Sequence, residues 1–149
     1  MAIENLPLER SGEPLPPHNT EAEEAVLGSL LIDRDAVSQV ASFLRPSDFF
    51  RDRHAAVYEA ALRLYDRREH VDFLTLSDEL QRTGRYEDVG GLAFLYSLLS
   101  VVPTSLHVEQ YGRIVEHAAV RRRLIQAAGR IAALGYDEAL HTDQALEQA

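Results

Sequence analysis

The sequence predicts an all-α fold, and three features carry that prediction. Apolar side chains recur at spacings of three and four residues in one segment after another, which is the period of an amphipathic helix. Residues that favour helix starts stand ahead of these segments, and Gly or Pro follows several of them. No segment shows the sustained alternation of apolar and polar residues that marks a half-buried strand.

The N-terminal part begins with an arm and continues into helices. Residues 1–17 contain four Pro and are expected to form a flexible arm. Thr20 opens the first helix, where Thr20 and Glu23 have the spacing of a capping box. We interpret Glu21, Glu23 and Glu24 as first-turn acids that complement the helix dipole. Four further helices are expected, at Arg34–Leu44, Arg53–Tyr65, Phe73–Thr83 and Leu92–Ser100.

These helices are expected to pack into a compact head that comprises residues 18–104. Asp33, Asp52 and Asp72 each stand where a side chain can cap a helix start, and Pro103 closes the region. An apolar content of 46% is enough for a real core.

A long helix follows the head. From Ser105 to Gly135 apolar residues continue at helical spacing and no Pro interrupts them. Such a helix would be roughly 45 Å long, which is more than a small head needs, so its far half should project. A second helix starts near Thr142 and is cut off at Ala149. We therefore interpret residues 105–149 as a helical hairpin whose second helix is incomplete, in a fragment of a longer protein.

Composition and charge restrict the functions that the chain can have. The net charge is −9, whereas a stand-alone DNA-binding domain usually carries the opposite balance. The charge is unevenly spread, because Ser105–Tyr136 holds five Arg against two Glu while the rest of the chain is acidic. No apolar run approaches the ~20 residues of a membrane span. We expect a cytoplasmic protein with no membrane contact.

The sequence offers no catalytic or cofactor site. It contains no Cys and no Lys, so a thiolate ligand, a Cys nucleophile and a P-loop lysine are all excluded. The six His residues do not have the spacing of a zinc motif, and His54 is interpreted as a packed or capping residue. We therefore predict no catalytic, cofactor-binding or metal-binding residue in this chain.

The candidate functional residues lie instead on a surface for self-association or for a partner protein. The far half of the long helix carries an apolar stripe that the head cannot cover, and Arg residues flank it. Phe94 is either an aromatic that faces a partner or a core residue that packs on Leu98. The Arg residues form a solvated face, a protein interface or, least favoured, a nucleic-acid contact. The candidate interface set is Phe94, Arg121, Arg122, Leu124, Ile125, Ala128, Arg130 and Ile131.

Several motifs occur together in a fixed order. The first is PPHNTEAEEAVLGSLLID, at Pro16–Asp33. The motifs that follow are LRPSDFFR at Leu44–Arg51, VDFLTLSDEL at Val71–Leu80, GGLAFL at Gly90–Leu95, VPT at Val102–Thr104, YGRIVE at Tyr111–Glu116 and RRLIQA at Arg122–Ala127. In this order and spacing the chain resembles the N-terminal domain of DnaB-type replicative DNA helicases over about residues 16–136.

The resemblance implies a function without chemistry in this part of the protein. The intact protein would be a hexameric, ATP-dependent helicase that unwinds duplex DNA at the replication fork. Its RecA-like ATPase domain, with ATP, Mg and most DNA contacts, is absent from this chain. The domain present would form a collar, a trimer of dimers paired through the hairpins, that docks primase. The partners of the intact protein would also include a helicase loader.

Two alternatives remain at this point. The helicase-binding domain of primase has a similar helical head and hairpin, and a stand-alone helical adaptor or regulator would also be all-α. The EAEEAVLG motif at Glu21–Gly28 favours the helicase.

Overall fold

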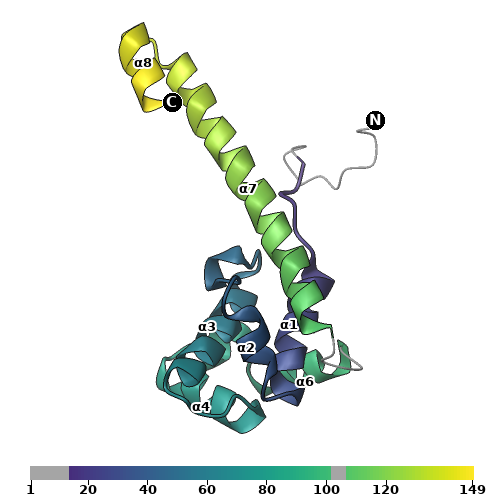
Figure 1. Cartoon of the computed structure of the whole chain (residues 1–149). Coiled ribbons are helices and arrows are strands. Elements are labelled where there is room, and N and C mark those ends of the chain that lie inside the picture. The colour runs from purple at the N-terminus through teal and green to yellow at the C-terminus, as the bar shows by residue number, and fades with distance from the viewer. Residues whose placement is uncertain (1–13, 102–106) are drawn as a thin grey trace. The chain divides into compact units, whose positions relative to one another are not determined.

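The computed structural model describes residues 14–101 and 107–149, and every regular element in these ranges is helical, which confirms the all-α fold. Most of the predicted arm and Pro103 lie outside the described residues. The elements in chain order (Figure 1) are α1 (Thr20–Ile32), α2 (Ala36–Val40), the 3-10 turn η1 (Pro46–Asp48), α3 (Asp52–Asp66), α4 (Phe73–Arg82), α5 (Tyr86–Val89), α6 (Gly91–Val101), α7 (Val108–Tyr136) and α8 (Thr142–Gln148).

The chain divides into two compact units. The larger one is His18–Ala119, which we call the head unit. The smaller one contains Val120–Ala149, which we call the hairpin unit, together with the described N-terminal residues 14–17. The head unit therefore extends beyond Thr104, where we expect the head to end, and takes in the first three turns of α7.

The helix starts differ in detail from those predicted. The cap of α1 is Asn19, whose side-chain oxygen accepts a hydrogen bond from the Ala22 N–H at 2.9 Å, so Thr20 is the first helical residue. Asp72 caps α4 as predicted, because its carboxylate accepts from the Thr75 N–H at 2.9 Å. The hydrogen bond from the Thr75 N–H also lowers the pKa of Asp72. Asp52 is not a cap but the first residue of α3.

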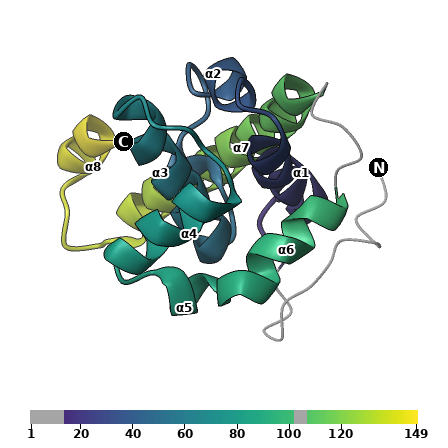
Figure 2. The same cartoon turned by 90° about the horizontal axis from the view of Figure 1, so that it is seen from below.

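Two segments of the head unit differ from the helices predicted from the spacing of apolar residues. The predicted helix Arg34–Leu44 was too long, since α2 covers only Ala36–Val40 and a turn follows it. The short helix α5 was not predicted. It ends at Gly90, whose φ of 105° lies in the left-handed region that an L side chain rarely adopts. Seen from below, α5 links α4 to α6 along one side of the head unit (Figure 2).

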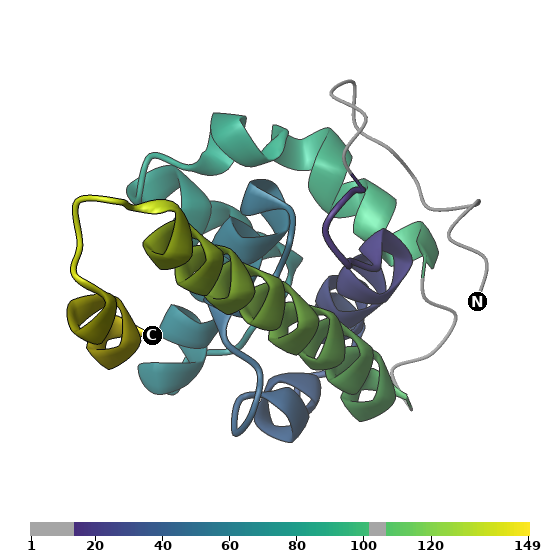
Figure 3. The ribbon, with the colours of Figure 1, turned by 90° about the horizontal axis from the view of Figure 1, so that it is seen from above.

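The core of the head unit forms where α1, α3, α4 and α6 pack together. The same passage from α4 through α5 into α6 is visible from above (Figure 3). Tyr58 of α3 is fully buried and donates its hydroxyl to the Leu44 carbonyl at 3.0 Å. Burial raises the pKa of this tyrosine. The largest fully buried apolar side chains are Tyr58, Leu27, Leu30, Leu44, Leu64, Leu76, Leu80, Leu95 and Leu98.

The first turns of α7 belong to this core because Gly112 permits a close approach. A Cβ at Gly112 would stand 3.0 Å from the Phe43 ring and 3.1 Å from a Val40 methyl group. The guanidinium of Arg113 also lies over this aromatic side chain, 3.6 Å from the Phe43 ring centroid. Val108 and Val115 of α7 are buried in the same core. The start of α7 is thus packed on the segment at the end of α2.

The two units should differ in local stability. In a monomer we expect the backbone amides of residues 125–134 to exchange with solvent faster than those of residues 27–31, because α1 is buried and residues 125–134 are largely exposed. Hydrogen–deuterium exchange read by NMR measures this directly. Equal protection of both segments would contradict the division into two units.

Candidate functional site

The predicted interface on α7 is exposed. Leu124 is 70% exposed, Ile125 is 56% exposed and Ile131 is 50% exposed, which is unusual for large aliphatic side chains. Arg121, Ala128 and Arg130 are also exposed, so most of the predicted residues lie at the surface of the hairpin unit. Arg122 is half-buried and donates from Nη1 to the Pro17 carbonyl at 2.8 Å.

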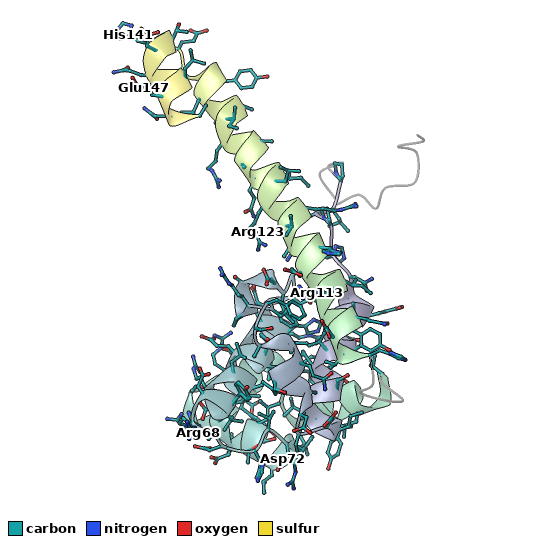
Figure 4. The ribbon with its side chains drawn as sticks, in the orientation of Figure 1. Arg68, Asp72, Arg113, Arg123, His141 and Glu147 are labelled. Carbon is teal, nitrogen blue, oxygen red and sulfur yellow. The ribbon has the colours of Figure 1, made fainter. Side chains whose placement is uncertain are left out.

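These residues do not form one continuous surface, because α7 presents them on different sides. A hollow of about 490 Å³ lies between α7 and the end of α8, and its lining includes Arg130 and Ile131. Leu124 falls near Ile131 by helical spacing, whereas Ile125 and Ala128 lie on the side away from the hollow. Figure 4 shows the labelled side chains of His141 and Glu147 in the α8 segment and of Arg123 on α7. Ala127, Ile131 and Leu134 line the hollow, and we call them the α8-facing stripe.

Phe94 is a core residue in this structure. Its side chain is only 7% exposed, and its ring stacks on the His54 imidazole with centroids 5.6 Å apart. The guanidinium of Arg53 covers the ring at 4.3 Å. A Cβ at Gly90 would come within 3.0 Å of the Phe94 Cβ, so the turn into α6 holds this residue close to the backbone. Of the two interpretations of Phe94, core packing fits this placement, although the partner is His54 rather than Leu98.

The residue that sequence reasoning misread is Glu23. It is buried, with 1% exposure, and makes no capping box with Thr20. Its carboxylate accepts hydrogen bonds from the Phe50 N–H at 2.5 Å and the Arg51 N–H at 3.4 Å. These amides belong to the two residues that immediately precede α3, so Glu23 of α1 holds the entry of another helix across the fold. A signal was available, because Glu23 precedes Val26 by three residues and thus falls on the apolar side of α1.

His54 completes this buried cluster. Its Nδ1 lies 2.6 Å from the Glu23 carboxylate, and its Nε2 lies 3.7 Å from the carboxylate of Glu24. The imidazole is fully buried and packs on Phe94, so the interpretation of His54 as a packed residue agrees with its position. In residues 14–101 and 107–149, no three His, Asp or Glu side chains gather closely enough to hold a metal ion. The cluster joins α1, α3 and α6.

A second buried carboxylate, Glu79 of α4, is held by two arginines. Arg67, at the end of α3, donates to it from Nη2 at 2.8 Å, and Arg82 of α4 does so at the same distance. These hydrogen bonds lower the pKa of Glu79 to about 2. The same contacts, with that to Glu69, raise the pKa of Arg67. The network fixes the end of α3 against α4.

The head unit thus has hydrogen-bonded buried carboxylates, and the hairpin unit has exposed aliphatic side chains on α7. A family model for the DnaB-like helicase N terminal domain matches residues 15–117. The chain belongs to this family. In the part of the chain that the structure describes, no helix is both long and apolar enough to cross a membrane.

Relatives of the DnaB family agree with this assignment. The replicative DNA helicase DnaB of Geobacillus stearothermophilus is 42% identical over 137 residues, which are 92% of this chain and 30% of the relative. DnaB of Leifsonia xyli is 41% identical over 128 residues, 86% of this chain and 28% of the relative. The chain thus spans about 30% of the length of these curated relatives.

Solved structures of the DnaB family have the same fold. The N-terminal domain of DnaB helicase from Mycobacterium tuberculosis is 38% identical, with a TM-score of 0.86 over 90% of this chain and 94% of that one. A DnaB-like replicative helicase, described with its interactions with primase, is 27% identical with a TM-score of 0.68 over 77% of this chain and 27% of that one. The family match favours the helicase family over the first alternative, a domain of primase.

We expect Glu23→Ala to lower the free energy of unfolding by about 3 kcal/mol, because it leaves two amides and a buried imidazole without their acceptor. Urea unfolding monitored by circular dichroism measures the change. Glu21→Ala is the matched control, since Glu21 is an exposed first-turn acid of the same helix and should change stability by less than about 0.5 kcal/mol. Equal effects of the two substitutions would show that Glu23 acts only on the helix dipole.

Acid should weaken the Glu79 network. A carboxyl group whose pKa is lowered on folding adds stability above its unfolded pKa, which is near 4.5, and this stability is lost as the pH falls towards 2. We expect Glu79→Gln to cost about 1–2 kcal/mol at pH 7, since solvent screens the two exposed arginines. The difference from the parent should shrink between about pH 5 and about pH 2. Asp78→Asn, at an exposed neighbour, should show no such trend in the same titration of unfolding curves.

Proposed function

We propose that this chain is the N-terminal collar domain of a hexameric replicative helicase, in which it mediates subunit assembly and primase docking. The proposal rests on membership of the DnaB N-terminal domain family and on the exposed apolar side chains of α7 in the hairpin unit. The exposed side chains of α7 are the observation that supports the assembly function. Each large aliphatic side chain left in water forgoes ~1.5–3 kcal/mol of the free energy that its burial would provide.

The partner that we propose for α7 is a second copy of the chain. Leu124 and Ile131 lie on one side of α7 and Ile125 lies on another, all within two turns. A second helical hairpin offers more than one helix and can therefore contact both sides. In the intact ring this contact would build dimers, and three dimers would make the collar. If the pair has two-fold symmetry, the interface is isologous.

The activity of the whole protein is proposed from the relatives, which are replicative DNA helicases about three times as long as this chain. We propose that the intact protein unwinds duplex DNA in the cytoplasm with ATP and Mg bound in an ATPase domain. The collar itself would perform no chemistry. Its acidic balance disfavours contact with DNA phosphates, so DNA would bind mainly elsewhere in the ring.

Primase is the proposed external partner, and a helicase loader is a further one. A related DnaB-like helicase has been described with its interactions with primase, which supports a docking role for this family member. Phe94 would contribute to docking only indirectly, by fixing α6, because its own side chain is buried. Exposed aromatic and aliphatic side chains of α4 and α6, such as Leu74 and Tyr96, are better placed to touch a partner.

The test of assembly is the double variant Ile125→Asp with Ile131→Asp. The two introduced carboxylates would be buried between the apolar side chains of two copies, and they should abolish self-association. Burying an unpaired carboxylate costs far more free energy than the apolar contact gains. Sedimentation velocity measures the oligomer, and far-ultraviolet circular dichroism should show that the head unit keeps its helices.

Ile32→Asp with Leu74→Asp is the matched control, since it places the same charges at exposed aliphatic residues of the head unit. This control should associate like the parent. If the α7 variant forms the same oligomer as the parent, α7 is not the assembly surface. Primase docking is tested separately, by titrating the parent chain with the helicase-binding domain of primase in a calorimeter; the absence of binding would remove that half of the proposal.

A further inference from the structure

A hollow of about 490 Å³ lies within the head unit, between the start of α1, the end of α6 and the first turns of α7. We call it the α1 hollow. Its volume lies in the range that is usual for ligand pockets. The residues that line it are Asn19, Glu21, Ala22, Glu24, Ala25, Val101, Tyr111 and Ile114.

Most of the lining of the α1 hollow is apolar. Ala22 and Ala25 are buried, and their small side chains leave room above this side of α1. Val101 and Ile114 belong to the same lining and are exposed. A surface of this kind suits an aliphatic chain, because its methylene groups gain free energy when apolar side chains cover them.

The charged residues in the lining are both acids. Glu21 and Glu24 lie three residues apart on α1, so their side chains are neighbours on the helix surface. No arginine belongs to the described lining, and the head unit carries 17 acidic residues against 10 Arg. The negative field of these acids favours a ligand that brings a positive charge into the hollow.

Glu24 is an independent reason to expect a basic ligand. Its side chain is only 24% exposed, yet no donor in the described part of the chain makes a hydrogen bond to its carboxylate. Nε2 of His54 lies 3.7 Å away, beyond hydrogen-bond distance, and this buried atom has no hydrogen-bond partner of its own. A largely buried carboxylate without a donor is costly, whereas Glu23 and Glu79 both have donors. A cation from another molecule would supply the donors that Glu24 lacks within the chain.

Arginine suits the α1 hollow better than lysine. The guanidinium is planar and has five N–H donors, so it can reach the carboxylates of Glu21 and Glu24 together. It also packs well on aromatic rings, and Tyr111 is part of the lining. The ammonium of lysine is more strongly hydrated and has fewer donors, and it would lose more on entering the hollow.

We propose that the α1 hollow is a docking site for an arginine side chain of a partner protein, whose aliphatic stem lies against the apolar lining and whose guanidinium pairs with Glu24 and Glu21. The exposed residues Glu21, Val101 and Ile114 let a side chain enter while the partner's backbone stays outside. Free arginine fits less well, because the two acids repel its carboxylate. The site is in the head unit and does not depend on self-association.

The test is a titration of the 15N-labelled chain with Nα-acetyl-arginine N-methylamide, followed by two-dimensional NMR. The amide signals of residues 21–25 and 111–114 should shift. The dissociation constant should be on the order of 1 mM, since so small a probe makes few contacts. Shifts confined to other segments would place the binding elsewhere and overturn the proposal.

Three related probes test the chemistry of recognition. The citrulline analogue has the same stem without the charge and should bind about tenfold more weakly. Free arginine and the lysine analogue should each bind several-fold more weakly than the capped arginine. Equal binding of the citrulline analogue would overturn the ion pair, and equal binding of the lysine analogue would overturn the assignment to arginine.

Two variants with the same change of charge test the position of the site. Glu24→Gln should weaken binding of the capped arginine about tenfold, because it removes a charge-assisted hydrogen bond. Glu87→Gln is the matched control, since Glu87 is an exposed acid of α5 that does not line the hollow. It should bind the probe like the parent. Equal losses in both variants would mean that the probe responds only to net charge, and the site would fall.

Urea unfolding of the same variant distinguishes a ligand site from a structural role of Glu24. The Glu24 carboxylate has no donor within the described chain, so Glu24→Gln should leave the midpoint of unfolding unchanged or raise it. Weakened binding then cannot result from a loss of fold. A clear fall in the midpoint would show that His54 holds Glu24 inside the head unit, and it would overturn the proposal.

Discussion

The head unit depends on one buried carboxylate. Glu23 of α1 accepts hydrogen bonds from the amides at the start of α3 and lies against His54, whose ring packs on Phe94 of α6. An unpaired charge in this position would cost several kcal/mol, so the three helices can come together only in the arrangement that satisfies it. Apolar packing alone would tolerate small shifts between these helices, whereas the hydrogen bonds do not.

Glu79 performs the corresponding task at the other end of α3. Its two arginines connect the end of α3 to α4, and so both ends of α3 are fixed through a buried carboxylate from a different helix. These two interior carboxylates are thereby occupied within the chain. The residues left for contact with partners are therefore those at the surface, such as the exposed aliphatic side chains of α7.

Local sequence signals predicted the helices well and the long-range contacts poorly. The periodicity placed α3, α4, α6 and α7 within a few residues, because their apolar stripes and stop residues are local features. Glu23 was misread because its hydrogen-bond partners lie 27 residues or more away in sequence. A first-turn glutamate that caps its own helix and one that caps another helix have the same local signature. The exposed apolar side chains of α7 were predictable for the opposite reason, since apolar residues at helical spacing continue beyond the predicted head in the sequence itself.

The composition of α7 follows from the several contacts that it has to make. Its first turns must approach α2 closely, which Gly112 allows, and its later turns have one side towards α8 and another that we assign to a second copy. Small residues are frequent in these later turns, and they suit a helix that other helices approach from more than one side. Ala meets that need without loss of helix propensity, so the Ala-rich stretch keeps the helix stable while both sides remain accessible.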